Sequence, residues 1–181
     1  MLQNKEHHTD LGFTLIELLV VIAIIGLLAS IVLVSFPNAT RKAHDATRLQ
    51  NVQQILTALR IYKSSNNAYP ARTADSCCDG WDQGPCNGNN TFINGLITSG
   101  TINTVPVDPT NKSGTGCYGF NYYVYNAGSY GCDASRGRFF VLGIRDMETS
   151  NRPQADSPGW SCPSRNWQSE FDWVTGSFEN D

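Results

Sequence analysis

The longest apolar stretch of this 181-residue chain runs from Phe13 to Phe36 and contains one charged residue, Glu17. An α-helix over these residues, rising about 1.5 Å per residue, would extend roughly 36 Å, more than the roughly 30 Å of a bilayer's hydrocarbon core. The stretch is also longer than the apolar region of an ordinary secretory signal. The pattern therefore predicts a membrane-spanning helix over residues 13–36. An acidic side chain in such a helix is costly unless it has a partner, so we expect Glu17 to make a specific contact.

The pattern becomes amphipathic after Pro37. Because proline removes a helix hydrogen bond, we expect a kink there, with a helix that resumes and ends near Ser65. Its apolar side chains recur at helical spacing on one face, which we expect to dock a folded head: Leu49, Val52, Ile55, Leu56, Leu59 and Tyr62. A separate face of small residues is the better candidate for contacts between subunits: Ala39, Ala43 and Ala46.

Beyond residue 69 the chain consists of short segments with alternating side chains. Phe120, Tyr122 and Val124 alternate with Asn121 and its neighbours, as in a half-buried antiparallel strand. We predict strands over 119–126, 138–145 and 171–175, and a helical turn over 92–100. Residues 148–166 are rich in Pro, Ser and Asn and are expected to form a long surface excursion held by Cys162. The predicted fold class is α+β, with a long N-terminal helix packed on a small antiparallel sheet in a head domain.

All six cysteines lie after residue 76: Cys77, Cys78, Cys86, Cys117, Cys132 and Cys162. An even number of cysteines in a Gly- and Asn-rich region predicts disulfides and an oxidising compartment outside the cytoplasm. The spacing does not match a zinc ribbon, and all three histidines lie outside this region, so we predict no zinc site. Six cysteines allow fifteen sets of pairings. Cys117 with Cys132 is the favoured pair because these residues flank the first predicted strand and its turn.

Charge and motifs argue against several classes of function. Residues 71–181 carry seven Lys or Arg against twelve Asp or Glu, so the head lacks the basic footprint that nucleic-acid binding requires. The head also lacks histidine, a Gly-x-Ser-x-Gly elbow and a phosphate-binding loop, so we predict no catalytic residues and no enzyme. The acid pairs Asp79 with Asp82 and Asp146 with Glu148 are expected to be solvated surface residues, and the alternatives are a catalytic role or calcium binding.

The segment Gly12-Phe13-Thr14-Leu15-Ile16-Glu17, with the apolar run that continues to Gly26, closely resembles the start of type IV pilins and of type II secretion pseudopilins. In that family a membrane peptidase cuts after the glycine and methylates the new amino terminus. The resemblance implies a leader over residues 1–12, processing at Gly12 and Phe13, and no cofactor, although related pseudopilins can hold calcium in the head. It implies as partners other copies of the chain, the prepilin peptidase, and an inner-membrane assembly platform with its ATPase.

Phe13 and Glu17 are the predicted assembly residues. A helix that starts at Phe13 presents a positive α-amino group and the positive end of its dipole, which attract an acid from a neighbouring helix. In a filament of parallel helices Glu17 can supply that acid, and the pair could set the stagger between subunits. The alternative is that Glu17 extends to the membrane interface and has no partner.

The predicted divisions are the leader (1–12), the membrane and assembly helix (13–36), the amphipathic stalk (37–68) and the head (69–181). We predict a filament subunit that begins as a single-pass precursor in the inner membrane with its head outside, and then joins an extracellular or periplasmic filament. The basic residues after the apolar run favour the opposite orientation, but the cysteines and the resemblance outweigh them. Two alternatives stay open: a pseudopilin of a secretion or DNA-uptake system, and an anchored binding protein that never polymerises.

Overall fold

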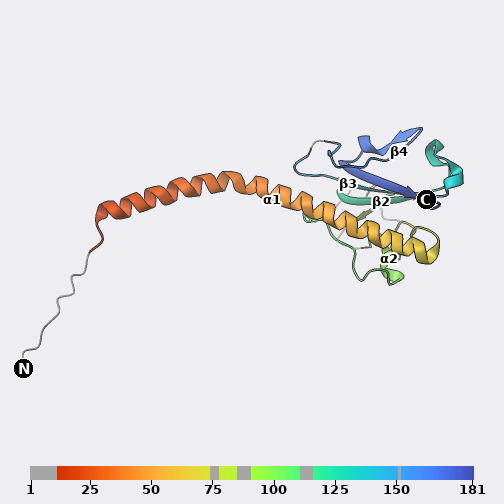
Figure 1. Ribbon diagram of the computed structural model, residues 1–181, viewed down its shortest axis with the longest axis horizontal. Coiled ribbons are helices and arrows are strands. Elements are labelled where there is room, and N and C mark those ends of the chain that lie inside the picture. Colours follow the sequence, from red (N-terminus) through yellow and green to blue (C-terminus); the bar gives the residue numbers. More distant parts are fainter. Residues whose placement is uncertain (1–11, 74–77, 85–90, 111–115, 151) are drawn as a thin grey trace, which may run out of the picture. The chain divides into compact units, whose positions relative to one another are not determined.

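The computed structural model describes residues 12–73, 78–84, 91–110, 116–150 and 152–181. The chain divides into two compact units, Met1–Thr40 and Arg41–Asp181, and each is described by itself. One long helix, α1 (Leu15–Asn66), contains residues of both units (Figure 1). The predicted helix before and after Pro37 is thus confirmed, and α1 includes Pro37 as an interior residue. Its C-terminal end falls one residue after the predicted Ser65.

From Leu15 to Ile31, in the first unit, the apolar side chains of α1 contact solvent rather than a core. Leu15 is 84% exposed, Ile22 is 60% exposed and Ile31 is 62% exposed, and the residues between them follow the same pattern. By length and composition α1 could cross a membrane. A soluble protein would rarely present so continuous an apolar surface to water, because such surfaces mark contacts with membranes or other proteins.

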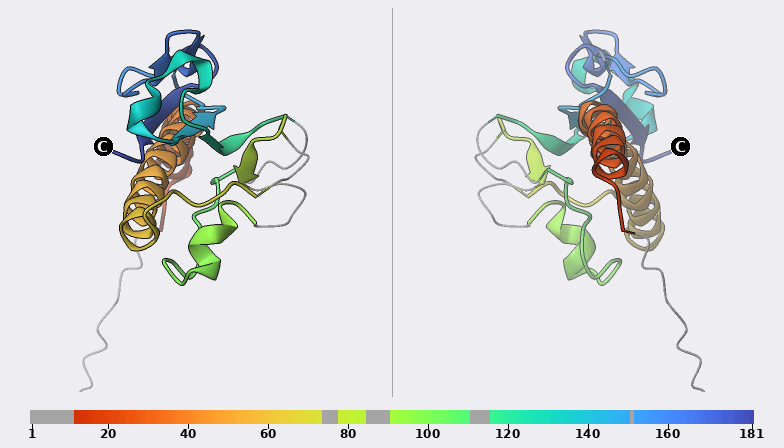
Figure 2. Two further views of the ribbon diagram at one scale, coloured as in Figure 1. Left: turned by 90° about the vertical axis from the view of Figure 1, so that its right-hand side faces the viewer. Right: turned by 90° about the vertical axis from the view of Figure 1, so that its left-hand side faces the viewer.

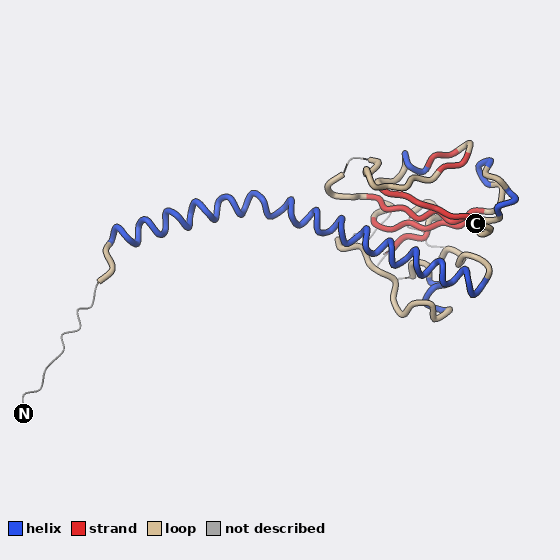
Figure 3. The backbone as a smooth tube through the Cα atoms, viewed as in Figure 1, coloured by secondary structure: helices blue, strands red, loops and turns tan. Residues whose placement is uncertain are grey.

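The second unit is built on a four-stranded antiparallel sheet with strand order β1-β2-β3-β6 (Figure 3). The strands are β1 (Asp82–Gly84), β2 (Gly119–Tyr125), β3 (Phe139–Arg145) and β6 (Trp173–Phe178). Tyr122 of β2 pairs with Leu142 of β3, which in turn pairs with Thr175 of β6. The predicted strands over 119–126 and 138–145 are confirmed. The third strand begins two residues later than predicted, and β1 was not predicted because three residues are too short for an alternating pattern.

One face of the sheet packs against the second half of α1. Val52, Ile55 and Leu59 are fully buried, and they form one core with Phe120 and Leu142. Leu49, Leu56 and Tyr62 are partly buried against the same core. The prediction that this stripe docks the head is therefore confirmed. A short helix, α2 (Asn94–Thr98), lies within the predicted helical turn and contributes the buried Leu96.

The other face of the sheet is covered by the C-terminal segment. Within it, the predicted surface excursion over 148–166 is confirmed, because its described residues are exposed or partly exposed except Cys162, which is buried in a disulfide. A hairpin of β4 (Ser161–Cys162) and β5 (Arg165–Asn166) lies on the side of the head opposite α2 (Figures 1 and 2). Trp167 and Phe171 are fully buried against this second face of the sheet. Gly143 has no side chain there because a Cβ atom would lie 2.3 Å from the Phe171 ring.

Two disulfides hold this second layer. Cys78 pairs with Cys117 and Cys132 pairs with Cys162. The favoured pairing of Cys117 with Cys132 is therefore wrong. The reason is that the C-terminal segment folds back over the sheet and brings Cys162, rather than Cys117, to the turn after β2. Cys77 and Cys86 lie outside the described residues, so the prediction that all six cysteines pair stays a prediction.

Candidate functional site

The start of α1 is organised by Thr14 and Glu17. Thr14 immediately precedes α1, and its Oγ1 accepts a hydrogen bond from the Glu17 backbone N–H at 3.3 Å. The Glu17 Oε2 in turn accepts the Thr14 backbone N–H at 2.9 Å and the Thr14 hydroxyl at 2.7 Å. This reciprocal arrangement is a capping box, which satisfies two N–H groups that a helix start leaves without partners.

The capping role of Glu17 was missed by sequence reasoning, although the Thr-x-x-Glu spacing before an apolar run is its known signal. The predicted assembly role concerns a contact with another copy of the chain, so it stays a prediction. The two roles are compatible. Glu17 uses Oε2 for the cap, and Oε1 makes no hydrogen bond among the described residues.

The residues at the predicted processing point have no internal structural task. Phe13 is 75% exposed, and no atom outside its chain neighbours lies within 4 Å of the position that a Cβ on Gly12 would occupy. Gly26, within α1, has equally open surroundings. Neither glycine is therefore needed to relieve crowding within this chain. The small-residue face of Ala39, Ala43 and Ala46 is likewise exposed, and its predicted role in subunit contacts stays a prediction.

A buried ionic cluster fastens α1 to the head around Arg48, whose side chain is 1% exposed. Arg48 donates from Nε and Nη2 to the two carboxylate oxygens of Asp108, at 2.7 and 3.1 Å. Its Nη1 donates to Asp45 at 2.8 Å and to Glu148 at 2.9 Å. The cluster thus joins α1 to the connector before β2 and to the loop after β3.

The charges in this cluster stabilise one another. Burial alone would lower the pKa of Arg48, but hydrogen bonds and charge from Asp108, Glu148 and Asp45 outweigh it and raise that pKa. Burial alone would raise the pKa of Asp108, yet the bonds from Arg48 and Thr110 hold it below its ordinary value. Asp45 also accepts the backbone N–H groups of the loop after β3. The bonds that Arg48, Asp45 and Asp108 make in this cluster therefore serve the fold.

Both predicted surface acid pairs are corrected in part. Glu148 is only 22% exposed, bonds to Arg48 and lies at hydrogen-bond distance from His44, with 2.9 Å between Oε1 and Nδ1. Asp82 is fully buried, and its Oδ2 accepts backbone N–H groups from Thr73 at 2.7 Å and from Ile93 at 2.9 Å. No local pattern predicts either burial, because the partners lie far away in the chain or in irregular backbone. Asp79 is exposed as expected.

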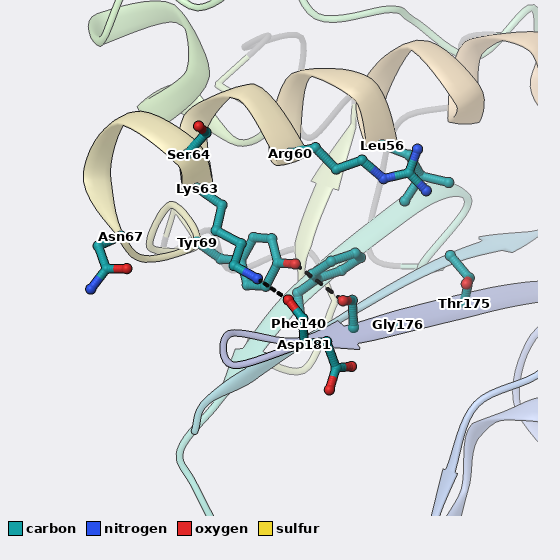
Figure 4. Close-up of a pocket in the computed structure, with 11 residues that line it drawn as sticks. Leu56, Arg60, Lys63, Ser64, Asn67, Tyr69, Phe140, Thr175, Gly176 and Asp181 are labelled. Carbon is teal, nitrogen blue, oxygen red and sulfur yellow. Dashed lines mark hydrogen bonds between the residues drawn. The ribbon is translucent and has the colours of Figure 1, made fainter. Parts of the chain in front are cut away.

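A cleft of about 580 Å³ lies between the last turns of α1 and strand β6 (Figure 4). Tyr69 donates to the Ser177 hydroxyl at 3.2 Å, and Lys63 donates to the backbone oxygen of Asp181 at 3.0 Å. Both bonds connect the end of α1 to the end of the chain. The side chains drawn in Figure 4 include no histidine or cysteine.

Within the described part of the chain, no three His, Cys, Asp or Glu side chains are grouped so that they could hold a metal ion. This finding concerns only those residues. The possibility of calcium in the head thus stays an untested expectation.

Comparison with known proteins places the chain in a family. Residues 8–33 match the model of the prokaryotic N-terminal methylation motif. The chain is 30% identical to type II secretion system core protein G of Escherichia coli over 122 residues, which are 66% of this chain and 74% of that protein. The chain belongs to the type IV pilin and pseudopilin family.

Two further relatives show how far this pilin-family likeness extends. Core protein G of Vibrio cholerae is 28% identical over 157 residues, which are 87% of this chain and 96% of that protein. The type IV wide pilus major component PilA4 of Thermus thermophilus is 34% identical over 76 residues, which are 42% of this chain and 58% of that protein.

Other matches are confined to a smaller part of the pilin-family relatives. The chain spans 38% of core protein G of Pectobacterium carotovorum and 41% of that of Aeromonas hydrophila. No solved structure matches this pilin-family chain significantly. The resemblance inferred from Gly12, Phe13 and Glu17 is confirmed at the level of the family.

Proposed function

We propose that this chain is a structural subunit of a type IV pilus-like filament, and that the subunit polymerises through the first half of α1. The observation that carries the proposal is the exposed apolar surface that follows the capping box at Thr14 and Glu17. Apolar surface of this extent needs a membrane or a protein partner. After the subunit is extracted from the membrane, a bundle of identical helices from other subunits supplies that protein partner.

We propose two stages for the subunit, a membrane precursor and an assembled filament subunit. The precursor is a single-pass protein of the inner membrane, with the disulfide-bonded head on the oxidising side. The prepilin peptidase removes residues 1–12, and an assembly platform with its ATPase then adds the subunit to an extracellular or periplasmic filament. In this proposal the head is a displayed, non-enzymatic domain, and it does not bind nucleic acid directly.

A second candidate is the filament of a type II secretion system. The alignment with core protein G of Vibrio cholerae over 96% of that protein favours it. Both candidates share processing, polymerisation and the exposed helix, and they differ in whether the filament emerges from the cell or drives secretion. Deletion of the chain from its native cells separates them. Loss of surface filaments supports the pilus, and loss of secreted proteins with intact surface filaments supports the secretion system.

The proposal is tested first at the processing point. Gly12→Val adds a side chain where no neighbouring atom of the chain lies within 4 Å, so it should leave the fold unchanged. We expect the peptidase to reject it, because the enzyme must approach the backbone at a small residue. Mass spectrometry should then find the leader attached, Phe13 unmethylated and no filaments in the sheared fraction.

The matched control is Gly26→Ala, at a glycine with equally open surroundings. This variant should be processed as the wild type is. Filaments built from uncleaved Gly12→Val protein would refute the proposed processing step.

A further inference from the structure

A second pocket, of about 320 Å³, lies on the sheet face opposite α1, beside the Cys78–Cys117 disulfide. Its lining combines two arginines, two acids, three tyrosines and a tryptophan: Arg145, Arg165, Asp79, Glu170, Tyr123, Tyr125, Tyr130 and Trp81. This volume is at the small end of ligand pockets, which suits a single ring rather than a large ligand. The disulfide joins Cys78, in the turn before β1, to Cys117, just before β2, and both cysteines line the pocket.

Arg145 is the unusual member of the pocket. It ends β3, its side chain is 22% exposed, and its guanidinium lies over the Phe171 ring at 4.4 Å. Its polar contacts are long: 4.0 Å from Nη2 to Glu170, and 3.9 Å from Nη1 to the Cys78 sulfur. Its buried Nε has no acceptor among the described residues. A guanidinium carries five N–H donors, and most of those of Arg145 have no close acceptor among the described residues.

Arg165, in the same pocket, provides the contrast. It donates to both oxygens of Glu170 at 2.8 Å and to the Tyr130 hydroxyl at 2.6 Å. Glu170 therefore pairs mainly with Arg165 and neutralises the charge of Arg145 only weakly. Burial lowers the pKa of Arg145, and the nearby charge of Glu170 only partly opposes that effect. A partly buried cation without a close counter-ion is a recognised mark of a binding site.

The remaining groups indicate which anion fits. A carboxylate matches the planar guanidinium of Arg145 with two parallel hydrogen bonds. A dianion such as phosphate would be repelled more strongly by Glu170 and by Asp79, which also faces the pocket. Burial raises the pKa of Tyr125 to about 12, so its hydroxyl stays protonated and polar. The guanidinium of Arg145 matches one carboxylate of a ligand. The acids and tyrosine hydroxyls around it match several hydroxyl groups of the same ligand.

We propose that this pocket binds a carboxylated sugar, a uronic acid unit, with its carboxylate on Arg145 and its hydroxyl groups on Asp79 and the tyrosines. The Trp81 ring is 5% exposed and meets the Tyr123 ring edge-on at 5.5 Å, and Tyr123 stacks on Tyr125, so these rings hold the shape of the pocket while polar groups make the proposed contacts to the sugar. Such units occur as repeating residues of acidic polysaccharides outside cells, where we propose that the head is displayed. The pocket would let the head attach to that material.

The test is a binding titration of the full chain in detergent micelles, followed by ligand-observed NMR. Galacturonate is the probe, and galactose, acetate and inorganic phosphate are the comparison ligands. We expect galacturonate to bind at millimolar concentration and the other three to bind at least tenfold more weakly. Failure of galacturonate to bind, or tighter binding of phosphate, would overturn the proposal.

Variants locate the site. Arg145→Gln should weaken galacturonate binding at least tenfold, and Arg145→Lys should weaken it less, because lysine keeps the charge but loses the two-pronged geometry. Arg136→Gln, at a surface arginine that pairs with Asp181, is the matched control and should bind as the wild type does. Near-UV circular dichroism checks that each variant is folded. Undiminished binding by folded Arg145→Gln would place the sugar elsewhere and refute this assignment.

Discussion

The two halves of α1 share one backbone conformation but differ in where their apolar side chains find partners. In the first half Ile22 is 60% exposed, and in the second half Ile55 and Leu59 are fully buried in the head. The second half is also fastened by Arg48, which bonds to three carboxylates of the same chain. The described residues supply no such fastening to the first half, whose Glu17 bonds only to its neighbour Thr14.

One helix can therefore serve two environments, the core of its own head and the surroundings outside the monomer. Burial of an aliphatic side chain typically contributes about 1.5–3 kcal/mol, and the second half gains it within the monomer. The first half can gain it only from lipid or from other copies of the chain. Substitutions in the second half should therefore change the stability of the head, and substitutions in the first half should change assembly.

The largest stability effect is expected at Arg48. Arg48→Ala leaves Asp45 and Asp108 buried without their cation, which typically costs about 3–5 kcal/mol. The measurement is urea unfolding of the full chain in detergent, followed by tryptophan fluorescence. Arg60→Ala, at an exposed arginine of the same helix, should change the unfolding free energy by less than about 0.5 kcal/mol. Equal effects of the two substitutions would refute a structural role for the cluster.

The pH profile sharpens the same prediction. Burial alone would raise the pKa of Asp45, but hydrogen bonds from Thr149, Glu148 and Arg48 hold it below its ordinary value, and Asp108 is lowered as well. A lowered folded-state pKa contributes stability above the unfolded value of about 3.9, and this contribution is lost as the pH falls through the folded values. Wild-type stability should thus fall below about pH 4. Arg48→Ala should lose much of this acid sensitivity.

A matched pair of core and membrane substitutions tests the comparison itself. Leu59→Ala removes a fully buried side chain and should lower the unfolding free energy of the head by about 2–5 kcal/mol. Ile22→Ala removes similar apolar surface from an exposed position and should leave head unfolding unchanged, but it should reduce filament yield. Loss of head stability in Ile22→Ala would show that the first half of α1 has a partner within its own chain.

Removal of one disulfide should have a comparable or slightly smaller effect. Replacing both Cys132 and Cys162 by serine should cost about 2–4 kcal/mol, because the unfolded chain then loses a constraint across 30 residues. Peptide mapping without reduction should find Cys132 joined to Cys162 and Cys78 joined to Cys117. A Cys117–Cys132 peptide would contradict the fold. Thiol titration of the denatured protein tests the separate prediction that all six cysteines are paired.

Local periodicity explains what sequence reasoning predicted well. The stripe from Leu49 to Tyr62 repeats at helical spacing, and the alternation around Phe120 repeats at strand spacing, so each pattern reports a nearby buried face. The capping box of Thr14 and Glu17 is also a local signal, although it was overlooked in favour of the predicted contact between subunits.

Long-range contacts explain what could not be predicted. Arg48 contacts Asp108 and Glu148 only because the connector before β2 and the loop after β3 pack against α1. No local sequence pattern predicts these contacts. The same holds for Cys162, which reaches Cys132 because the C-terminal segment folds over the sheet. That segment also buries Phe171, so β2 is covered on both faces where one solvated face was expected.

The central claim, that the first half of α1 assembles filaments through Glu17, is tested most directly by comparing Glu17→Ala with Thr14→Ala. Each substitution breaks the side-chain bond and one backbone bond of the capping box, which should cost about 0.5–2 kcal/mol, but only Glu17→Ala removes the carboxylate offered to the Phe13 amino group of a neighbour. The measurement is filament recovered by shearing, relative to the amount of subunit in the membrane. The account predicts a normal membrane level for both variants, few or no filaments from Glu17→Ala, and near-normal yield from Thr14→Ala. Normal yield from Glu17→Ala, or equal loss from both variants, would contradict it.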